Sequence, residues 1–265
     1  MVIKKLTLAN FRNYEAETFR FTDGLNVLTG RNAQGKTNCA EAVFYLCTGA
    51  SLRIRHDRQL IRRGETCARI SAEASTRFGS VALEAAIFEN KRELYLNGNR
   101  LARAADFVGN MNSVFFSPGE LRLIQDGPDE RRRFLNLSIS QTSREYCTAL
   151  ARYQRILDQR NNLLKERDVS LVLETLPVWD EQLALFAARI VRHRRRYLKQ
   201  LSPLASDAHS YLTDGAEKLS LDMDGRYPDE EGEIAEKLLK EFSAARERDL
   251  RLGFTSVGPH RDDIK

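Results

Sequence analysis

The chain has 265 residues, of which 42% are hydrophobic and 30% charged, so it is long enough for one or two domains with buried cores. The net charge of +5 is a mild excess overall, but residues 131–200 hold 15 Lys or Arg against 7 Asp or Glu. This local excess favours an anionic partner. The N-terminus lacks the apolar core of a signal peptide, and no run approaches the ~20 apolar residues of a membrane span, which predicts a soluble cytoplasmic protein.

The first informative motif is the phosphate-loop pattern G-x-x-x-x-G-K-[ST], which reads Gly30, Arg31, Asn32, Ala33, Gln34, Gly35, Lys36 and Thr37. In such a loop the backbone N–H groups surround the phosphates, Lys36 reaches the β- and γ-phosphates, and the Thr37 hydroxyl ligates Mg²⁺. The apolar run 25–29 predicts a buried strand before the loop, and residues 38–46 predict a helix after it. Because the helix N-terminus attracts anions, this order predicts a site for a nucleotide and Mg²⁺, and the family resemblance described below implies that the nucleotide is ATP.

The rest of the first half is predicted to form an antiparallel sheet. Strands are expected at residues 2–8, 18–21, 69–74 and 81–88, and Asn97-Gly98 between apolar residues predicts a hairpin. Residues 113–116 predict one more strand. Pro128 suits the first position of a helix that runs through Leu137.

The second half is predicted to be mainly helical. Apolar residues at heptad spacing indicate one long helix from Tyr146 to Leu164 and a second from Trp179 to Tyr211, with a break near Thr175–Pro177. A third helix is expected at 234–250, and Phe254–Val257 predicts a strand.

A phosphate-loop ATPase also needs a second strand that ends in an acidic residue, which holds Mg²⁺ and orients water. The run 85–89 ends in Glu89, but the hairpin that follows it indicates an ordinary antiparallel strand. We therefore expect the acidic strand, the Walker B strand, to lie beyond Lys265. We also expect this chain to bind nucleotide while hydrolysing little, so no catalytic residue is assigned within it.

Several segments together resemble the RecF family, which is related to SMC and ABC-type ATPase heads. They are LTLANFRNY at 6–14, SPGEL at 117–121, GPDERRRFLN at 127–136 and TSVGPHRDD at 255–263. The resemblance implies an α/β P-loop ABC/SMC-like ATPase head, with a mixed sheet plus antiparallel strands, and an α-helical insertion domain. It places the head lobe at 1–137, the insertion at 138–250, and a return strand to the head at 251–265.

The resemblance also implies a function in DNA replication and repair. Members of this family form ATP-dependent homodimers with weak ATPase activity, and bind double-stranded and gapped DNA. They act at single-strand/double-strand junctions, where RecR and RecO help load RecA. By the same resemblance, Arg12 and Asn13 are expected beside the nucleotide.

The basic cluster of the second helix is predicted to contact DNA phosphates, although a solvated helix face is the plainer interpretation. Its members are Arg192, Arg194, Arg195, Arg196 and Lys199.

Two further charged runs have alternative interpretations. Arg131–Arg133 is expected either to pair with neighbouring acids at a helix start or to face a partner head. The segment His260–Asp263 is expected to be a structural turn, since one His without a second ligand cluster does not indicate a metal site.

Other functional classes are less favoured. Another SMC/ABC-type head remains open as an alternative, and a P-loop kinase is a weaker one because it does not explain the long heptad stripes. A GTPase is disfavoured because residues 90–93, Asn-Lys-Arg-Glu, lack the Asp of the N-K-x-D motif.

Overall fold

The structure is a computed structural model of the whole chain, and it describes residues 1–51, 53–54, 56–77, 79–223 and 227–264. The chain forms two compact units, which are described separately below. Unit 1 comprises Met1–Ser117 and Ser140–Arg144, and unit 2 comprises Pro118–Ile139 and Glu145–Lys265. The division after Ser117 differs from the predicted domain limit at 137, because the helix that begins at Pro128 belongs mostly to unit 2.

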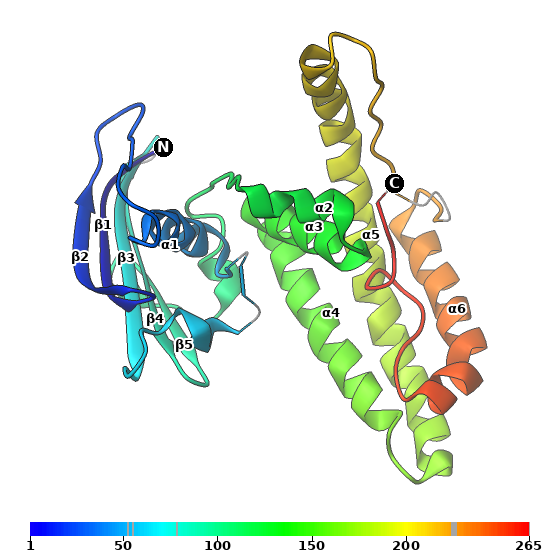
Figure 1. Cartoon of the computed structure of the whole chain (residues 1–265). Coiled ribbons are helices and arrows are strands. Elements are labelled where there is room, and N and C mark those ends of the chain that lie inside the picture. The colour runs from blue at the N-terminus through cyan, green and yellow to red at the C-terminus, as the bar shows by residue number, and fades with distance from the viewer. Residues whose placement is uncertain (52, 55, 78, 224–226, 265) are drawn as a thin grey trace. The chain divides into compact units, whose positions relative to one another are not determined.

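Unit 1 is built on a six-stranded sheet in the order β2-β1-β3-β4-β5-β6 (Figure 1). Its strands are β1 (Val2–Phe11), β2 (Tyr14–Arg20), β3 (Cys67–Thr76), β4 (Gly79–Phe88), β5 (Arg92–Leu96) and β6 (Asn99–Arg100). All neighbouring strands pair antiparallel. The predicted hairpin is confirmed, because Asn97 and Gly98 both have positive φ, 50° and 79°, as a tight turn between β5 and β6 requires.

One helix, α1 (Lys36–Thr48), packs against the sheet. In β3 every second residue from Ala68 to Ala74 is buried, which follows from the two-residue period of a strand. These residues meet Tyr45 and Leu46 of α1 in one apolar core. Two short 3₁₀ helices, η1 (Asp57–Leu60) and η2 (Ala104–Asp106), complete this unit.

Two predicted strands of unit 1 are not formed. Residues 25–29, before the phosphate loop, are irregular, and Leu25 and Val27 are 88% and 70% exposed. Residues 113–116 are also irregular, with Val114 99% exposed. No strand of the described residues pairs with either run. An apolar run becomes a strand only when a neighbour supplies backbone hydrogen bonds, and the local sequence does not reveal whether that neighbour is present.

Unit 2 is helical. Its elements are η3 (Pro118–Leu121), α2 (Arg122–Gln125), α3 (Pro128–Thr142), α4 (Arg144–Leu163), α5 (Val169–Leu212) and α6 (Glu231–Leu252). Helices α4, α5 and α6 share an apolar core (Figure 1), to which they contribute residues such as Tyr146, Ile190 and Phe242. The heptad stripes are therefore core packing along most of their length. The C-terminal part of the second stripe is exposed to solvent, because Leu204 and Tyr211 of α5 are 67% and 84% exposed.

The break between the two long helices lies before the predicted position. Residues 164–168 link α4 to α5, and the Asp168 side chain caps α5 by accepting a hydrogen bond from the Leu171 N–H at 3.1 Å. Thr175–Pro177, where the break was predicted, lies inside α5. Pro177 lacks the N–H that would donate to the Leu173 carbonyl, and the helix continues through it.

The predicted return strand is wrong as well. Arg251 and Leu252 end α6, and the following residues 253–264 are irregular, apart from a single bridge between Met223 and Ile264. Among the described residues, no helix is long and apolar enough to cross a membrane.

Candidate functional site

The phosphate loop leads directly into α1, as its motif predicts, although the strand predicted before the loop is not formed. Gly35 is the N-cap residue, no side chain caps the helix, and no acidic residue lies in the first turn. The first N–H groups of a helix have no intrahelical acceptor and carry a partial positive charge. An anion placed before Lys36 would therefore meet unoccupied donors.

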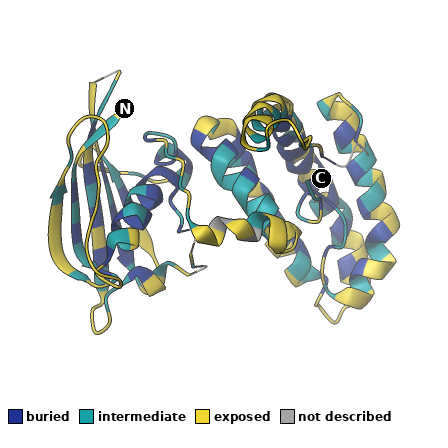
Figure 2. Cartoon of the chain, turned by 45° about the horizontal axis from the view of Figure 1, so that its top comes forward, coloured by how far each residue is buried: buried dark blue, intermediate teal, exposed yellow. Residues whose placement is uncertain are grey.

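Lys36 folds back over the loop. Its Nζ donates to the carbonyl oxygens of Gly30 and Arg31, both at 2.7 Å. The ammonium group thus lies at the mouth of the loop, and residues 22–34 around it are exposed (Figure 2). Thr37 is exposed as well, so its hydroxyl is accessible to a hydrated cation.

Gly35 is packed too tightly to carry a side chain. A Cβ atom there would lie 2.7 Å from the Tyr14 ring and hydroxyl, and 2.8 Å from Oδ1 of Asn13. Its φ of 98° also favours glycine. Asn13, predicted to lie near the nucleotide, therefore contacts the phosphate loop itself, and its Oδ1 accepts a hydrogen bond from Asn38 of α1 at 2.8 Å.

Arg12, the other residue predicted beside the nucleotide, is committed to an internal ion pair. Its Nε and Nη2 donate to the two carboxylate oxygens of Glu41 at 3.0 and 2.8 Å. Glu41 is only 2% exposed and also accepts from Ser51 and, at 3.3 Å, from Arg53. Arg12 therefore joins the turn between β1 and β2 to α1.

Sequence reasoning missed Glu41 and Arg53. The Arg53 guanidinium also donates to Asn38 at 2.9 Å and is 46% exposed. A signal for Glu41 was present, because an acidic residue within the apolar stretch of α1 must be paired when the helix is buried.

The predicted DNA-contact cluster on α5 separates into three kinds of residue. Arg194 is 3% exposed, and its guanidinium donates to Tyr146, Pro259 and Asn136. This burial removes Arg194 from the set of residues that could reach a DNA phosphate.

The other members of the cluster lie toward solvent. Arg192 pairs with Glu231 at 2.5 Å, and Arg195 pairs with Asp229 at 2.6 Å. Arg196 and Lys199 are exposed, and no hydrogen bond or ion pair joins them to another described residue.

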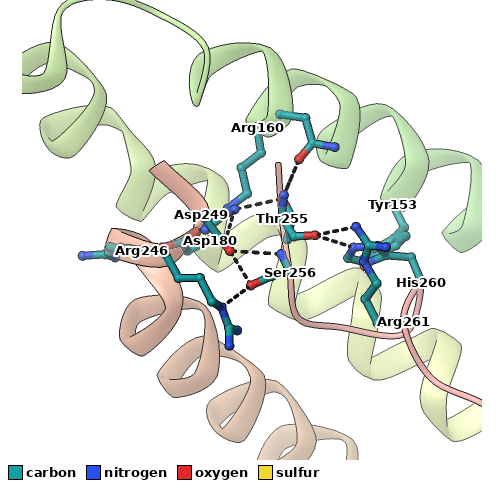
Figure 3. Close-up of polar contacts among 11 residues, drawn as sticks. Tyr153, Arg160, Asp180, Arg246, Asp249, Thr255, Ser256, His260 and Arg261 are labelled. Carbon is teal, nitrogen blue, oxygen red and sulfur yellow. Dashed lines mark hydrogen bonds and ion pairs between the residues drawn. The ribbon is translucent and has the colours of Figure 1, made fainter. Parts of the chain in front are cut away.

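The segment 255–263, which sequence reasoning singled out, is anchored by a buried ionic network (Figure 3). Arg160 of α4 is fully buried, and its guanidinium donates at 2.8 Å to Asp180, Asp249 and Thr255. Arg246 completes the pairing of Asp180 at 2.9 Å. The network thus joins all three long helices to the C-terminal segment.

His260 continues this network. Its Nδ1 lies 2.6 Å from the Tyr153 hydroxyl, and its Nε2 lies 3.0 Å from the Thr255 carbonyl oxygen. Burial lowers the pKa of His260 to about 4, so the ring is neutral near pH 7. Neutral imidazole satisfies both contacts when Nε2 donates and Nδ1 accepts.

The remaining charged run is also structural. Arg131 forms a two-bond ion pair with Asp263, at 2.7 and 2.9 Å, and Arg132 pairs with Asp129. Within the described ranges, no group of three or more His, Cys, Asp or Glu could hold a metal ion. Residues 259–261 form a turn, and His260 and Asp263 on either side of Arg261 are held by contacts within unit 2.

Comparison with known proteins supports the interpretation of the loop. A family model described as an AAA domain matches residues 5–202. A phosphate loop at the start of a helix, in a chain that matches this model, defines a P-loop ATPase of mixed α/β fold.

More specific relatives identify the family. The chain is 41% identical to the DNA replication and repair protein RecF of Geobacillus kaustophilus over 100% of this chain and 73% of that protein. It is 37% identical to the protein of the same name from Alkaliphilus oremlandii, with the same coverage. The chain belongs to the RecF family.

Solved structures agree. The recombination mediator protein RecF of the RecFOR pathway, in a structure with ATP, matches 99% of this chain with a TM-score of 0.90 and 30% identity. A second RecF structure, with ATPrS, matches all of it with a TM-score of 0.88 and 31% identity. Both matches cover 72% of the solved chain.

Proposed function

We propose that the chain binds ATP in residues 30–37 and that ATP controls its binding to DNA. The observation that carries this proposal is the open N-terminus of α1, which has no capping side chain and no acid in its first turn. Lys36 is already held at the loop mouth by two carbonyl oxygens, so a phosphate can take its charge with little rearrangement. The similar RecF structure with ATP supports the choice of nucleotide.

Mg²⁺ fits the same site through Thr37, whose exposed hydroxyl is the protein ligand that the motif supplies. Hydrolysis is expected to be slow. Among the described residues, no acidic side chain contacts Lys36 or Thr37, and Glu41 is occupied by Arg12, Ser51 and Arg53. A carboxylate that orients water would have to come from elsewhere.

The proposed role is that of its relatives, which are named as DNA replication and repair proteins and as a mediator in the RecFOR pathway. In this proposal two ATP-bound copies dimerise, bind gapped DNA at single-strand/double-strand junctions, and act with RecR and RecO to load RecA in the cytoplasm. The surplus of basic residues in 131–200 supports an anionic macromolecule as partner.

The test compares the unaltered chain with Lys36→Ala. Loss of the charge-assisted hydrogen bonds to phosphate should weaken ATP binding about ten- to hundred-fold in calorimetry. Gel shifts with gapped duplex DNA should lose their dependence on ATP in this variant. Lys91→Ala is the matched control, because Lys91 is an exposed lysine of unit 1 that pairs with Glu93 outside the loop.

Two results would contradict the proposal. Equal ATP affinity in the Lys36 and Lys91 variants would remove the loop as the nucleotide site. If DNA affinity is the same with and without ATP, the nucleotide does not regulate DNA binding. Transfer of the γ-phosphate to a small acceptor would favour a kinase.

A further inference from the structure

A row of basic side chains follows one face of α5 in unit 2. Arg192, Arg195, Arg196 and Lys199 are spaced i, i+3, i+4 and i+7, and residues at this spacing share a helix face. At 1.5 Å per residue the row extends over about 10 Å. All four residues line one cavity of about 390 Å³, whose other side is formed by residues 221–223 and Asp229.

The cavity has an apolar floor and a charged rim. Leu198 and Met223 are 3% and 4% exposed, so they form the floor. Asp222 and Asp229 are exposed acids that also line the cavity. The site is therefore a basic recess with acidic groups on one side.

The four cations are not equally available. Glu231 holds Arg192, and Asp229 together with the Tyr227 and Pro228 carbonyl oxygens holds Arg195. Arg196 and Lys199 have no such partner among the described residues. Arg196 and Lys199, on one helical turn, thus line the recess without an ion pair to another described residue, although Asp222 lines the same recess.

We propose that this recess binds successive backbone phosphates of duplex DNA through Arg196 and Lys199, and that Asp229 competes with the DNA for Arg195. The inference rests on the proposed DNA-binding function and assigns a contact site within it. Arg194, although adjacent in sequence, has no part because it is buried.

The length of the row favours a polymer of phosphates over a single anion. One DNA strand presents a phosphate about every 3.4 Å along the helix axis and also winds around that axis, so a row of about 10 Å is long enough to contact more than one phosphate. A small anion would engage only part of this row.

The acidic rim gives the site a built-in competitor. Asp229 is 91% exposed and lies 2.6 Å from Arg195, so its pairing is weak and exchangeable in water. A phosphate can replace it only after the ion pair opens. Removal of the carboxylate should therefore strengthen DNA binding, whereas removal of the unpaired cations should weaken it.

The experiment measures fluorescence anisotropy of a labelled duplex DNA, at saturating ATP, between about 50 and 200 mM salt. In the variant Arg196→Gln/Lys199→Gln, the slope of log affinity against log salt should fall by about 1.8, since each lost phosphate contact removes about 0.9. Over this salt range the unaltered chain should then lose about ten-fold more affinity than the variant. Both side chains are exposed, so folding should be unaffected.

The matched control is Lys165→Gln/Arg167→Gln, which removes the same charge near the start of α5, outside the recess. Its slope should stay near that of the unaltered chain. Asp229→Asn should raise the affinity and steepen the slope by about 0.9. Its own control, Asp207→Asn, removes one negative charge from α5 outside the recess and should have a smaller effect.

Equal slopes for the recess variant and the lysine–arginine control would overturn the inference, because net charge alone would then explain the loss. Displacement of DNA by inorganic phosphate at constant ionic strength, in the unaltered chain but not in the recess variant, would indicate a small-anion site and overturn it too.

The underlying function fails in a different manner. If DNA affinity does not change with ATP or in Lys36→Ala, but still falls in the recess variant, only the proposed control by ATP is contradicted. Absence of DNA binding by the unaltered chain at the lowest salt would overturn both proposals.

Discussion

The two units hold their charged groups in opposite ways. In unit 1 the helix N-terminus at Gly35 has no side-chain cap, and Lys36 Nζ donates to two backbone carbonyl oxygens. In unit 2 the most buried cations, Arg160 and Arg194, are bound by three partners each. Unit 1 therefore exposes groups that a ligand can satisfy, while unit 2 uses its two most buried cations to join helices to the C-terminal segment.

This contrast shows that the number of cations in a segment says little about how many can bind a ligand. Arg194 and Arg196 lie two residues apart in one basic run, but the first is buried and the second is exposed. A buried cation needs fixed partners to offset the loss of water, whereas an exposed one does not. The predictions below test this division.

The largest effect is expected for Arg160→Met. This change leaves Asp249 buried without its cation and weakens the pairing of Asp180, so it should lower the free energy of unfolding by about 3 to 5 kcal/mol in urea denaturation. The control is Arg155→Met on the same helix, where the side chain is exposed and the expected change is within about 0.5 kcal/mol. Similar losses in both variants would contradict the structural role of the network.

Gly35→Ala is expected to come next. The new methyl group would lie 2.7 Å from Tyr14, and the φ of 98° disfavours alanine. Together these should destabilise unit 1 by about 2 to 3 kcal/mol and weaken ATP binding.

Gly64→Ala separates the two causes in that experiment. Gly64 has a φ of 92°, but nothing lies within 4 Å of its Cβ position. Only the backbone strain, about 1 to 2 kcal/mol, should remain. If the two variants lose equal stability and both keep ATP affinity, the close packing against Tyr14 has no energetic importance.

The pH dependence of stability tests the neutral state of His260. Its folded pKa of about 4 lies below the ordinary value of 6.5, mainly because of burial. Below pH 6.5 the unfolded chain therefore takes up a proton that the folded chain does not. The stabilising contribution is complete above pH 6.5 and should fall by about 2 kcal/mol between pH 7 and pH 5.

His260→Gln should remove this part of the pH dependence, because glutamine does not titrate but has both a donor and an acceptor for the same contacts. The measurement is chemical denaturation of both proteins at the two pH values. Equal pH dependence in the two would show that His260 is protonated as readily when folded as when unfolded.

The sequence predicts the elements whose signals are local. The phosphate loop with α1, the Asn97-Gly98 hairpin and the alternation of β3 depend on spacing and turn geometry within a few residues. Residues 25–29 and 254–257 have strand composition but form no strand. Strand pairing depends on distant neighbours, and the composition of these two short runs does not show whether such neighbours are present.

The site shows the same limit. Residues 30–37 follow from one motif, but the commitment of Arg12 to Glu41, 29 positions away, depends on tertiary structure. The sequence shows the basic run on α5. It does not show that Arg194 is buried while Arg196 is exposed, because that depends on the contacts of Arg194 with Tyr146 and Pro259. Charge can be read from sequence, but partners at long separation cannot.

The smallest effect is expected for Arg53→Gln, and it sharpens the contrast within unit 1 itself. Arg53 and Arg12 both pair with Glu41, but Arg53 is 46% exposed and its contact is 3.3 Å long, whereas Arg12 is 19% exposed with a contact of 2.8 Å. Exposed pairs contribute little because water screens them, so Arg53→Gln should cost less than about 1 kcal/mol in urea denaturation. Arg12→Gln should cost more, because Glu41 would keep its burial and lose both strong hydrogen bonds. A larger loss at Arg53 than at Arg12 would mean that the more exposed arginine contributes more to fixing Glu41 of α1 than the less exposed one.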